Sequence, residues 1–348
     1  MGDAGSVTPV RRQRAWRIAR LAAIGTGATV AATAATGGML LGQARQARRT
    51  IPMAEAPPPR CDGVYGAKLP GPPVTMVILG DSSAAGYGVH RRRETPGALL
   101  ATGLSRRLHR PVRLHRFAVV GALSAGLRPQ VESALEVGPE IAVVLVGGND
   151  VTNRTPPSVA VRCLADAVRT LRAAGCEVVV GTCPDLGAIR PIQPPLRWLA
   201  RRWSRQLAAA QTVAVVEAGG RTVSLGDLLG PRFAAEPARM FAWDRFHPSA
   251  EGYAMAAAAL LPTVLSALGA VSERRPSLTG LEGVRSLPEA AHEAARHAGT
   301  EVTGAQLRGR DRGPGGRWAL LRRRAFFGVG AVPPTGTAAD SATLEGTA

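Results

Sequence analysis

Five short runs rich in Val, Ile and Leu alternate along the chain with longer segments in which apolar residues recur at helical spacing. Because the runs lack the alternation of a half-exposed sheet, they predict strands buried on both faces, as in a parallel sheet. The predicted strands are Thr75 to Leu79, Val112 to Val120, Ile141 to Val146, Glu177 to Thr182 and Thr212 to Glu217. The predicted helices are Pro96 to Leu108, Pro129 to Leu135, Ser158 to Ala174, Pro195 to Ala210 and Ser249 to Leu268. Five βα units predict an α/β fold, a doubly wound three-layer sandwich with a five-stranded parallel sheet.

The N-terminal part of the chain has a different pattern. Residues 21–44 carry no charged side chain, and five Arg precede them, which suits a membrane-spanning helix with the following domain outside. The run is rich in Ala, Gly and Thr, so a cleaved secretory signal and a soluble Ala-rich helix stay open as alternatives. We therefore expect a signal or membrane anchor over residues 1–50 and export of the rest of the chain.

The remaining boundaries follow from composition. Residues 51–73 are Pro-rich and predict an extended linker, and residues 74–271 predict the folded domain. Residues 272–348 are polar and rich in Gly, with charges of both signs, so they predict a largely disordered tail with one short helix at Pro288 to His297.

The charge of the chain is strongly positive, with a formal net charge of +18 over 348 residues, and Lys68 is its one Lys among 43 basic residues. The excess is spread over the N-terminal, central and C-terminal parts. No predicted helix has a basic stripe interleaved with aromatic residues, and no DNA- or RNA-binding motif occurs, so nucleic acid is not an expected partner. We expect a monomer that contacts the membrane through its N-terminal helix.

Four cysteines are too few for a disulfide scaffold, and their spacing does not form a metal site. No cofactor or metal is expected. Cys176 and Cys183 flank one predicted strand, about 23 Å apart, and cannot pair. A helix followed by a strand brings Cys163 and Cys183 to nearly the same level, so a bridge between them is predicted for an exported protein, with two free thiols as the alternative.

Polar residues stand where the predicted strands end. Gly80-Asp81-Ser82-Ser83 follows the first strand, Gly121 the second, and Gly147-Gly148-Asn149-Asp150 the third, while Asp244-Arg245-Phe246-His247 precedes the last helix. The carboxyl ends of parallel strands meet at one edge of a sheet, where ligands bind in such folds. We therefore expect these residues to form one site.

The residue types fit nucleophilic catalysis. Ser82 can attack a carbonyl group if His247 takes its proton, and Asp244 can accept the Nδ1 proton of His247 and fix its tautomer. The N–H groups of Ser82 and Gly121 and the side-chain amide of Asn149 can stabilise the oxyanion.

These four blocks, in this order, resemble the SGNH hydrolases, also called GDSL esterases/lipases, over residues 74–269. The resemblance implies Ser82 as nucleophile, His247 as base and Asp244 as its partner, with Ser82, Gly121 and Asn149 as the oxyanion hole. Two flanking positions depart from the family pattern. Ser83 stands where Leu is usual, and Val119 where Asn is common.

The expected function is hydrolysis of carboxylic esters through an acyl-enzyme, with a small-molecule or lipid ester as substrate. Within this class, lipid esters and O-acetyl groups on carbohydrates both stay open. The alternative from another class is a membrane-tethered, non-catalytic domain that binds glycan or lipid. The Pro-rich stretch Ile189 to Leu196 is interpreted as a lid, a wall of the acyl pocket or an ordinary crossover.

Overall fold

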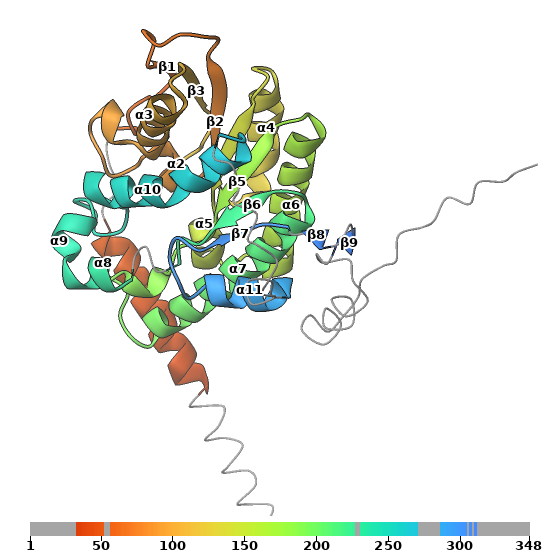
Figure 1. Cartoon of the computed structure of the whole chain (residues 1–348). Helices are drawn as coiled ribbons and strands as arrows, with labels where there is room; N and C mark the ends of the chain where they lie inside the picture. Colours follow the sequence, from red (N-terminus) through yellow and green to blue (C-terminus); the bar gives the residue numbers. More distant parts are fainter. Residues whose placement is uncertain are drawn as a thin grey trace, which may run out of the picture.

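A seven-stranded mixed sheet runs through the computed structural model, which describes residues 33–51, 56–226, 230–270, 286–304, 306–307 and 310–311 (Figure 1). The strand order is β1-β3-β2-β4-β5-β6-β7, in which the five inner strands are parallel and the two edge strands antiparallel. The strands are β1 (Gly63–Tyr65), β2 (Val74–Gly80), β3 (Val112–Arg116), β4 (Ile141–Leu145), β5 (Glu177–Gly181), β6 (Arg221–Val223) and β7 (Glu301–Val302). The predicted fold class, an α/β sandwich around five parallel strands, is confirmed.

Helices connect the strands and cover both faces of the sheet. The helix of residues 33–50 precedes the first strand. The labelled α-helices are α2 (Ser82–Ala85), α3 (Pro96–Leu108), α4 (Leu127–Leu135), α5 (Gly148–Thr152), α6 (Pro157–Ala173), α7 (Leu196–Glu217), α8 (Pro231–Ala235), α9 (Pro237–Met240), α10 (Ala250–Ala267) and α11 (Leu287–Ala294). The 3-10 turns are η1 (Arg92–Glu94), η2 (Ser124–Gly126) and η3 (Leu186–Ala188), and β8 (Gln306–Leu307) pairs with β9 (Arg310–Asp311).

The central strands are buried on both faces, as their apolar runs predict. In β2, Met76 and Ile78 belong to one core cluster, whereas Val77 and Leu79 belong to a second one. Successive side chains of a strand point to opposite faces, so a continuous apolar run supplies both cores at once. Helices α3 and α10 cover the first face and α4 and α6 the second (Figure 1).

The predicted fifth strand, Thr212 to Glu217, is wrong. These residues form the last turns of α7, whose buried side includes Ala208, Thr212 and Val215. Because α7 continues the helical spacing of its first half, its apolar end completes a buried helical face. The fifth parallel strand is β6, whose three residues include an Arg and leave no apolar run to detect.

The folded unit also extends beyond the predicted boundaries of residues 74–271. Strand β1, which lies in the predicted linker, pairs antiparallel with β3, and β7 from the predicted tail pairs with β6. Leu287 and Ala294 of α11 pack with Val216 of α7 in a small apolar cluster. The short helix predicted at Pro288 to His297 corresponds to α11, whereas the ordered strand β7 was not predicted. These elements are short, and they are stabilised by the domain they pack on.

The predicted disulfide is wrong, since all four cysteines are free. Cys183 belongs to the first core cluster, whereas Leu164, the neighbour of Cys163 in α6, belongs to the second. The distances along helix and strand set the level of the two sulfur atoms, but they do not say on which face of the sheet each one lies.

Residues 21–32, half of the uncharged run of residues 21–44, lie outside the described residues, and insertion of this run in a membrane stays a prediction. Within the described ranges, one helix is long and apolar enough to span a bilayer, namely α10. Tyr253, Leu260 and Val264 on its buried side pack in the domain, which makes α10 a core helix.

Candidate active site

Ser82 lies in a tight turn at the carboxyl end of β2. Gly80 has φ +131°, and a Cβ atom there would lie 1.8 Å from the carbonyl oxygen of Leu145 on β4, so only glycine fits. The next residue, Asp81, donates its N–H to the same carbonyl at 3.0 Å, and its Oδ1 accepts the N–H of Ser83 at 2.8 Å. This turn places Ser82 at the edge of the sheet.

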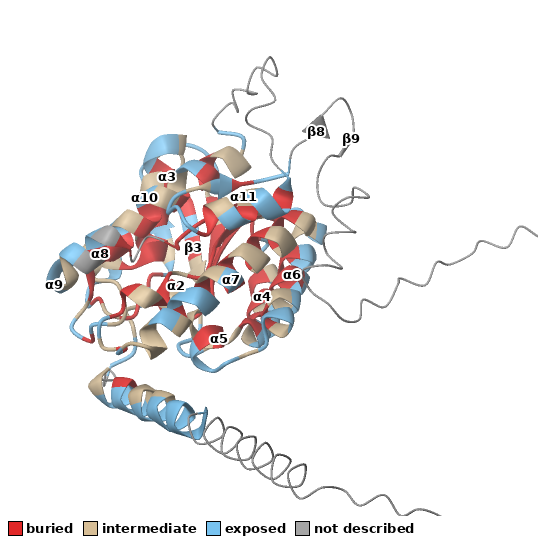
Figure 2. Ribbon diagram, turned by 90° about the horizontal axis from the view of Figure 1, so that it is seen from below, coloured by how far each residue is buried: buried red, intermediate tan, exposed pale blue. Residues whose placement is uncertain are grey.

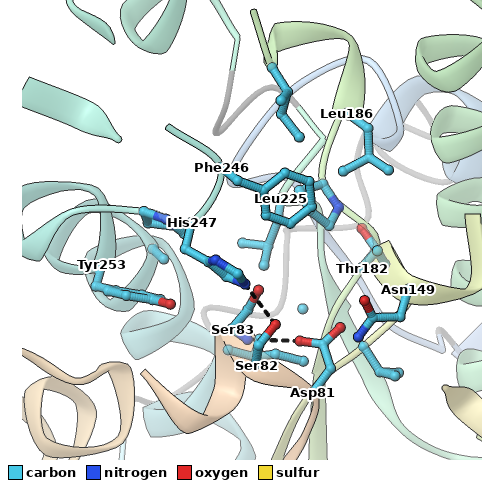
Figure 3. Close-up of a pocket in the computed structure, with 18 residues that line it drawn as sticks. Asp81, Ser82, Ser83, Asn149, Thr182, Leu186, Leu225, Phe246, His247 and Tyr253 are labelled. Carbon is cyan, nitrogen blue, oxygen red and sulfur yellow. Dashed lines mark hydrogen bonds between the residues drawn. The ribbon is translucent and has the colours of Figure 1, made fainter. Parts of the chain in front are cut away.

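His247 and Asp244 meet Ser82 from a loop more than 160 residues later in the chain. The Nε2 atom of His247 lies 2.8 Å from Ser82 Oγ, and its Nδ1 lies 2.6 Å from Asp244 Oδ2. The loop between them is shaped by Arg245, which has φ +58°. Figure 3 shows the His247 ring directed at Ser82. The structure thus brings the three sequence-predicted residues together in the predicted order.

The carboxylate of Asp244 is held in its ionised form. Its burial opposes ionisation, but the hydrogen bond and charge of His247 and the N–H groups of Phe246 and His247 outweigh it, and together they lower the pKa of Asp244. Its Oδ1 accepts both N–H groups at 3.0 Å. A fully buried carboxylate with three hydrogen bonds keeps a fixed orientation, and it therefore fixes the orientation of the imidazole.

Aromatic residues pack around the imidazole. The ring centroids of Tyr87 and Phe246 lie 4.5 and 4.9 Å from that of His247. The hydroxyl of Tyr253, on α10, donates to the carbonyl oxygen of Tyr87 at 2.7 Å. These contacts restrict His247 to the rotamer that faces Ser82. Neither tyrosine is among the sequence-predicted site residues, because an aromatic residue alone gives no signal that it supports a histidine.

Asn149 lines the cavity beside Ser82 (Figure 3). One N–H of its amide donates to the carbonyl oxygen of Ala122 at 3.1 Å, and an amide nitrogen carries two hydrogens, so a second donor remains. Gly121 precedes Ala122 on the same exposed loop and has φ +81°. It does not line the cavity that Ser82 and Asn149 share. The predicted role of Gly121 as a donor therefore stays a prediction.

Two buried glutamine side chains, which the sequence analysis also missed, fix the strand ends. Gln130 accepts the N–H of Gly80 at 2.7 Å and donates to its carbonyl oxygen at 3.0 Å. Gln211 accepts the N–H of Cys183 at 2.8 Å and donates to the carbonyl oxygen of Val146 at 3.1 Å. Each amide satisfies one donor and one acceptor of the backbone where a strand stops pairing.

A mostly apolar cavity of about 60 Å³ lies next to Ser82, at the carboxyl ends of β4, β5 and β6. Its apolar walls include Leu145, Leu186, Ile189, Leu225, Phe246 and Ala256. Among the described residues that line the cavity, Asp81 has the only carboxyl group. Burial raises the pKa of Asp81 to about 6, although the Ser83 N–H and the charge of a protonated His247 favour its ionised form.

Other candidate groups have structural roles. Asp185 is buried, accepts the N–H of Gly187 at 2.8 Å within a turn, and pairs with Arg201 and Arg205. Among the described residues, no three or more His, Cys, Asp or Glu side chains gather into a metal site.

Residues 78–255, about half of the chain, match the model of the GDSL-like lipase/acylhydrolase family. The chain belongs to this family. A curated member, the GDSL-like esterase Rv1075c from Mycobacterium tuberculosis, is 45% identical over 260 residues, which cover 69% of this chain and 82% of that protein. The family and this relative make the protein a carboxylic ester hydrolase of the SGNH/GDSL type.

Solved structures resemble the domain more distantly. An SGNH hydrolase from Slackia heliotrinireducens is 22% identical, with a TM-score of 0.43 over 55% of this chain and 99% of that one. Axe2, an acetylxylan esterase from Geobacillus stearothermophilus, is 16% identical, with a TM-score of 0.42 over 58% of this chain and 97% of that one.

Proposed function

We propose that Ser82, His247 and Asp244 hydrolyse carboxylic esters with short acyl groups through an acyl-enzyme. The observation that carries this proposal is the pair of contacts at His247, 2.8 Å to Ser82 Oγ and 2.6 Å to Asp244 Oδ2, at the mouth of an apolar cavity. A serine so paired with an oriented imidazole is an activated nucleophile.

In the first half-reaction, Ser82 Oγ attacks the ester carbonyl while His247 Nε2 takes the hydroxyl proton. The imidazolium is stabilised by the buried Asp244 carboxylate. The oxyanion of the tetrahedral intermediate accepts hydrogen bonds from the Ser82 N–H, the free Asn149 N–H and the Gly121 N–H. When the intermediate collapses, the bond to the alcohol oxygen breaks, His247 returns its proton to that oxygen, and the acyl group stays on Ser82.

The second half-reaction repeats these steps with water. His247 takes a proton from a water molecule whose oxygen attacks the acyl carbonyl. The new tetrahedral intermediate collapses with cleavage of the bond to Ser82 Oγ, which receives the proton from His247. The acid leaves, and the enzyme returns to its starting state.

The size of the cavity supports short acyl groups. An apolar cavity of about 150 Å³ in another protein accommodates benzene, and the cavity here has less than half that volume. Leu186, Ile189 and Leu225 are among the apolar residues that line it. A cavity of this size favours an acetyl or other short acyl group, while a long chain requires the walls to move. This supports acetyl esters, including O-acetylated carbohydrates, over long-chain lipid esters.

The rival function, a non-catalytic domain that binds glycan or lipid, needs a cleft but no activated serine. Binding alone does not require the buried Asp244 carboxylate, or the aromatic rings of Tyr87 and Phe246, that orient His247 toward Ser82. The complete Ser-His-Asp constellation therefore favours catalysis.

A fluorophosphonate probe tests the proposal, because it labels only an activated serine. The full chain should be labelled at Ser82 and should hydrolyse p-nitrophenyl acetate. Ser82→Ala and His247→Ala should each lose nearly all activity, and the double variant should be scarcely worse, since triad members act as a unit. Ser83→Ala, the matched control on the adjacent residue, should keep labelling and activity. More than a tenth of the activity in Ser82→Ala would show that another group is the nucleophile.

A further inference from the structure

The side chain of Gln43, in the helix of residues 33–50, bonds to the domain. Gln43 Nε2 donates to the carbonyl oxygen of Pro194 at 2.7 Å, and Gln43 Oε1 accepts the N–H of Leu196 at 3.2 Å. One amide thus holds a backbone acceptor and a backbone donor that lie about 150 residues further along the chain. Ala47, one turn after Gln43, is buried in the main core cluster. Figure 2 shows this helix exposed over most of its length, with burial near the end that meets the domain.

The segment that Gln43 holds, Ile189 to Leu196, is called the wall segment below. It connects η3 to α7, and its first residue, Ile189, lines the cavity next to Ser82. Ile189 and Ile192 belong to the same core cluster as Ala47. Of the three earlier interpretations of this stretch, a wall of the acyl pocket agrees with this placement.

The wall segment has few backbone donors with which to hold itself. Three of its eight residues are proline, and proline has no N–H. Local backbone bonds include Ile189 N–H to Leu186 and Ile192 N–H to Ile189, at 3.3 and 3.2 Å. At its other end, the bonds from Gln43 hold Pro194 and Leu196. Residues at the start of α7 donate N–H groups to the carbonyl oxygens of Gln193 and Pro195, and Gln43 adds two bonds from outside the predicted catalytic domain.

We propose that Gln43 is a specificity-determining residue of this esterase, because it holds the wall segment against the acyl cavity. This inference rests on the proposed function, since the wall affects selectivity only if Ser82 carries an acyl group. It also bears on the N-terminal segment. If Gln43 has this role, the helix of residues 33–50 is part of the working enzyme. A retained anchor keeps Gln43, whereas signal cleavage beyond residue 43 removes it.

The test compares Gln43→Ala with Gln46→Ala in the full chain. Gln46 lies on the same helix with an exposed side chain, which makes it a matched control. For each variant, kcat and KM are measured with p-nitrophenyl acetate, butyrate and octanoate. Gln43→Ala should shift the ratio of kcat/KM for octanoate over acetate upward by about fivefold or more, the factor that the loss of one ordinary hydrogen bond gives. Most of the change for acetate should appear in KM, and Gln46→Ala should match the wild type.

A second variant, Gln43→Met, keeps the length and apolar packing of the side chain but removes both hydrogen bonds. It should show the same shift, and thermal melting should show that it is folded. If folded Gln43→Met or Gln43→Ala keeps the wild-type selectivity, the role of Gln43 is overturned. Fluorophosphonate labelling of Ser82 in the same experiment still supports the proposed function. A wild-type enzyme that is neither labelled nor active overturns the proposed function itself.

Discussion

Asp150 accepts two hydrogen bonds from Ser124, one from its N–H at 3.0 Å and one from its hydroxyl at 2.8 Å. Both residues are buried, and burial raises the pKa of Asp150, although the bonds from Ser124 favour its ionised form. The pair connects the turn after β4, which carries Asn149, to the loop after β3, which carries Gly121. This contact therefore acts together with the bond from Asn149 to the Ala122 carbonyl oxygen in positioning the two predicted oxyanion donors outside the serine turn.

The first prediction concerns this contact. Ser124→Ala removes the hydroxyl donor and should lower kcat for p-nitrophenyl acetate about tenfold, with KM within twofold, because the donors meet the oxyanion only in the transition state. Ser105→Ala is the control, since Ser105 is buried in α3 and its hydroxyl has no hydrogen-bond partner within the described structure. An unchanged kcat in Ser124→Ala would mean that the loop keeps its position without this bond.

The second prediction concerns Asn149. Asn149→Ala should lower kcat about a hundredfold or more and leave KM within a few fold, the effect of one lost oxyanion donor. Asn153→Ala is the matched control, because Asn153 lies one turn later and its exposed side chain bonds to the Asn149 carbonyl oxygen. A change mainly in KM would instead place Asn149 in substrate binding.

The third prediction concerns the depth of the acyl cavity. A Cβ atom on Gly181 would lie 2.5 Å from Leu145 Cδ2 and 2.7 Å from Leu225 Cδ1, so both leucine ends must move into the space they line. Gly181→Ala should therefore lower kcat/KM for butyrate about tenfold more than for acetate.

The control for this variant is Gly148→Ala. Gly148 lines the same cavity, but a Cβ atom there would meet nothing within 4 Å. It should leave the ratio of butyrate to acetate activity unchanged. Equal losses for both esters in Gly181→Ala would show that the acyl group binds elsewhere.

The fourth prediction concerns pH and Asp81. Its pKa rises from 3.8 to about 6 because the carboxyl is buried, so between these values the folded state binds more protons than the unfolded state. Asp81 therefore lowers the free energy of unfolding as pH rises through this window, by up to about 3 kcal/mol at neutral pH.

Asp81→Asn should remove this slope, because the amide keeps an oxygen that accepts the Ser83 N–H but carries no charge. Urea unfolding between pH 4 and pH 8 measures the difference, with Asp166→Asn as a control at an exposed site. If the free energies of unfolding of wild type and Asp81→Asn change in parallel with pH over this range, Asp81 is ionised without cost in the folded state.

Local sequence was sufficient where one segment carries the whole signal. The predicted helix Pro96 to Leu108 is α3 to the residue, because Thr95 caps its first turn and Pro96 suits the first helical position. The contact of Asp244 with His247 is also local, since the two residues are three apart and share one turn. The predicted strand ends are correct to within a residue for β2, β4 and β5, because their apolar runs are interrupted by glycine or polar residues.

Predictions from local sequence failed where contacts with a distant segment determine the secondary structure. Thr212 to Glu217 is β-branched and apolar, yet it forms helix because its side chains complete a buried face of α7. Strands β1, β6 and β7 have two or three residues each, and they are strands because a neighbouring strand supplies hydrogen bonds. No periodicity can be read from so few positions.

The sequence by itself determined the fold class and the order of Ser82, Asn149, Asp244 and His247 at one edge of the sheet, because buried strands and the turns that end them have local signatures. Only the tertiary structure decided how those residues are held. Gln130 on Gly80, Gln211 on Cys183, Ser124 on Asp150 and Gln43 on the wall segment each join positions more than 25 residues apart. A polar side chain carries no sign of its distant partner, since its hydrogen bonds form only after the apolar core has brought the two segments together.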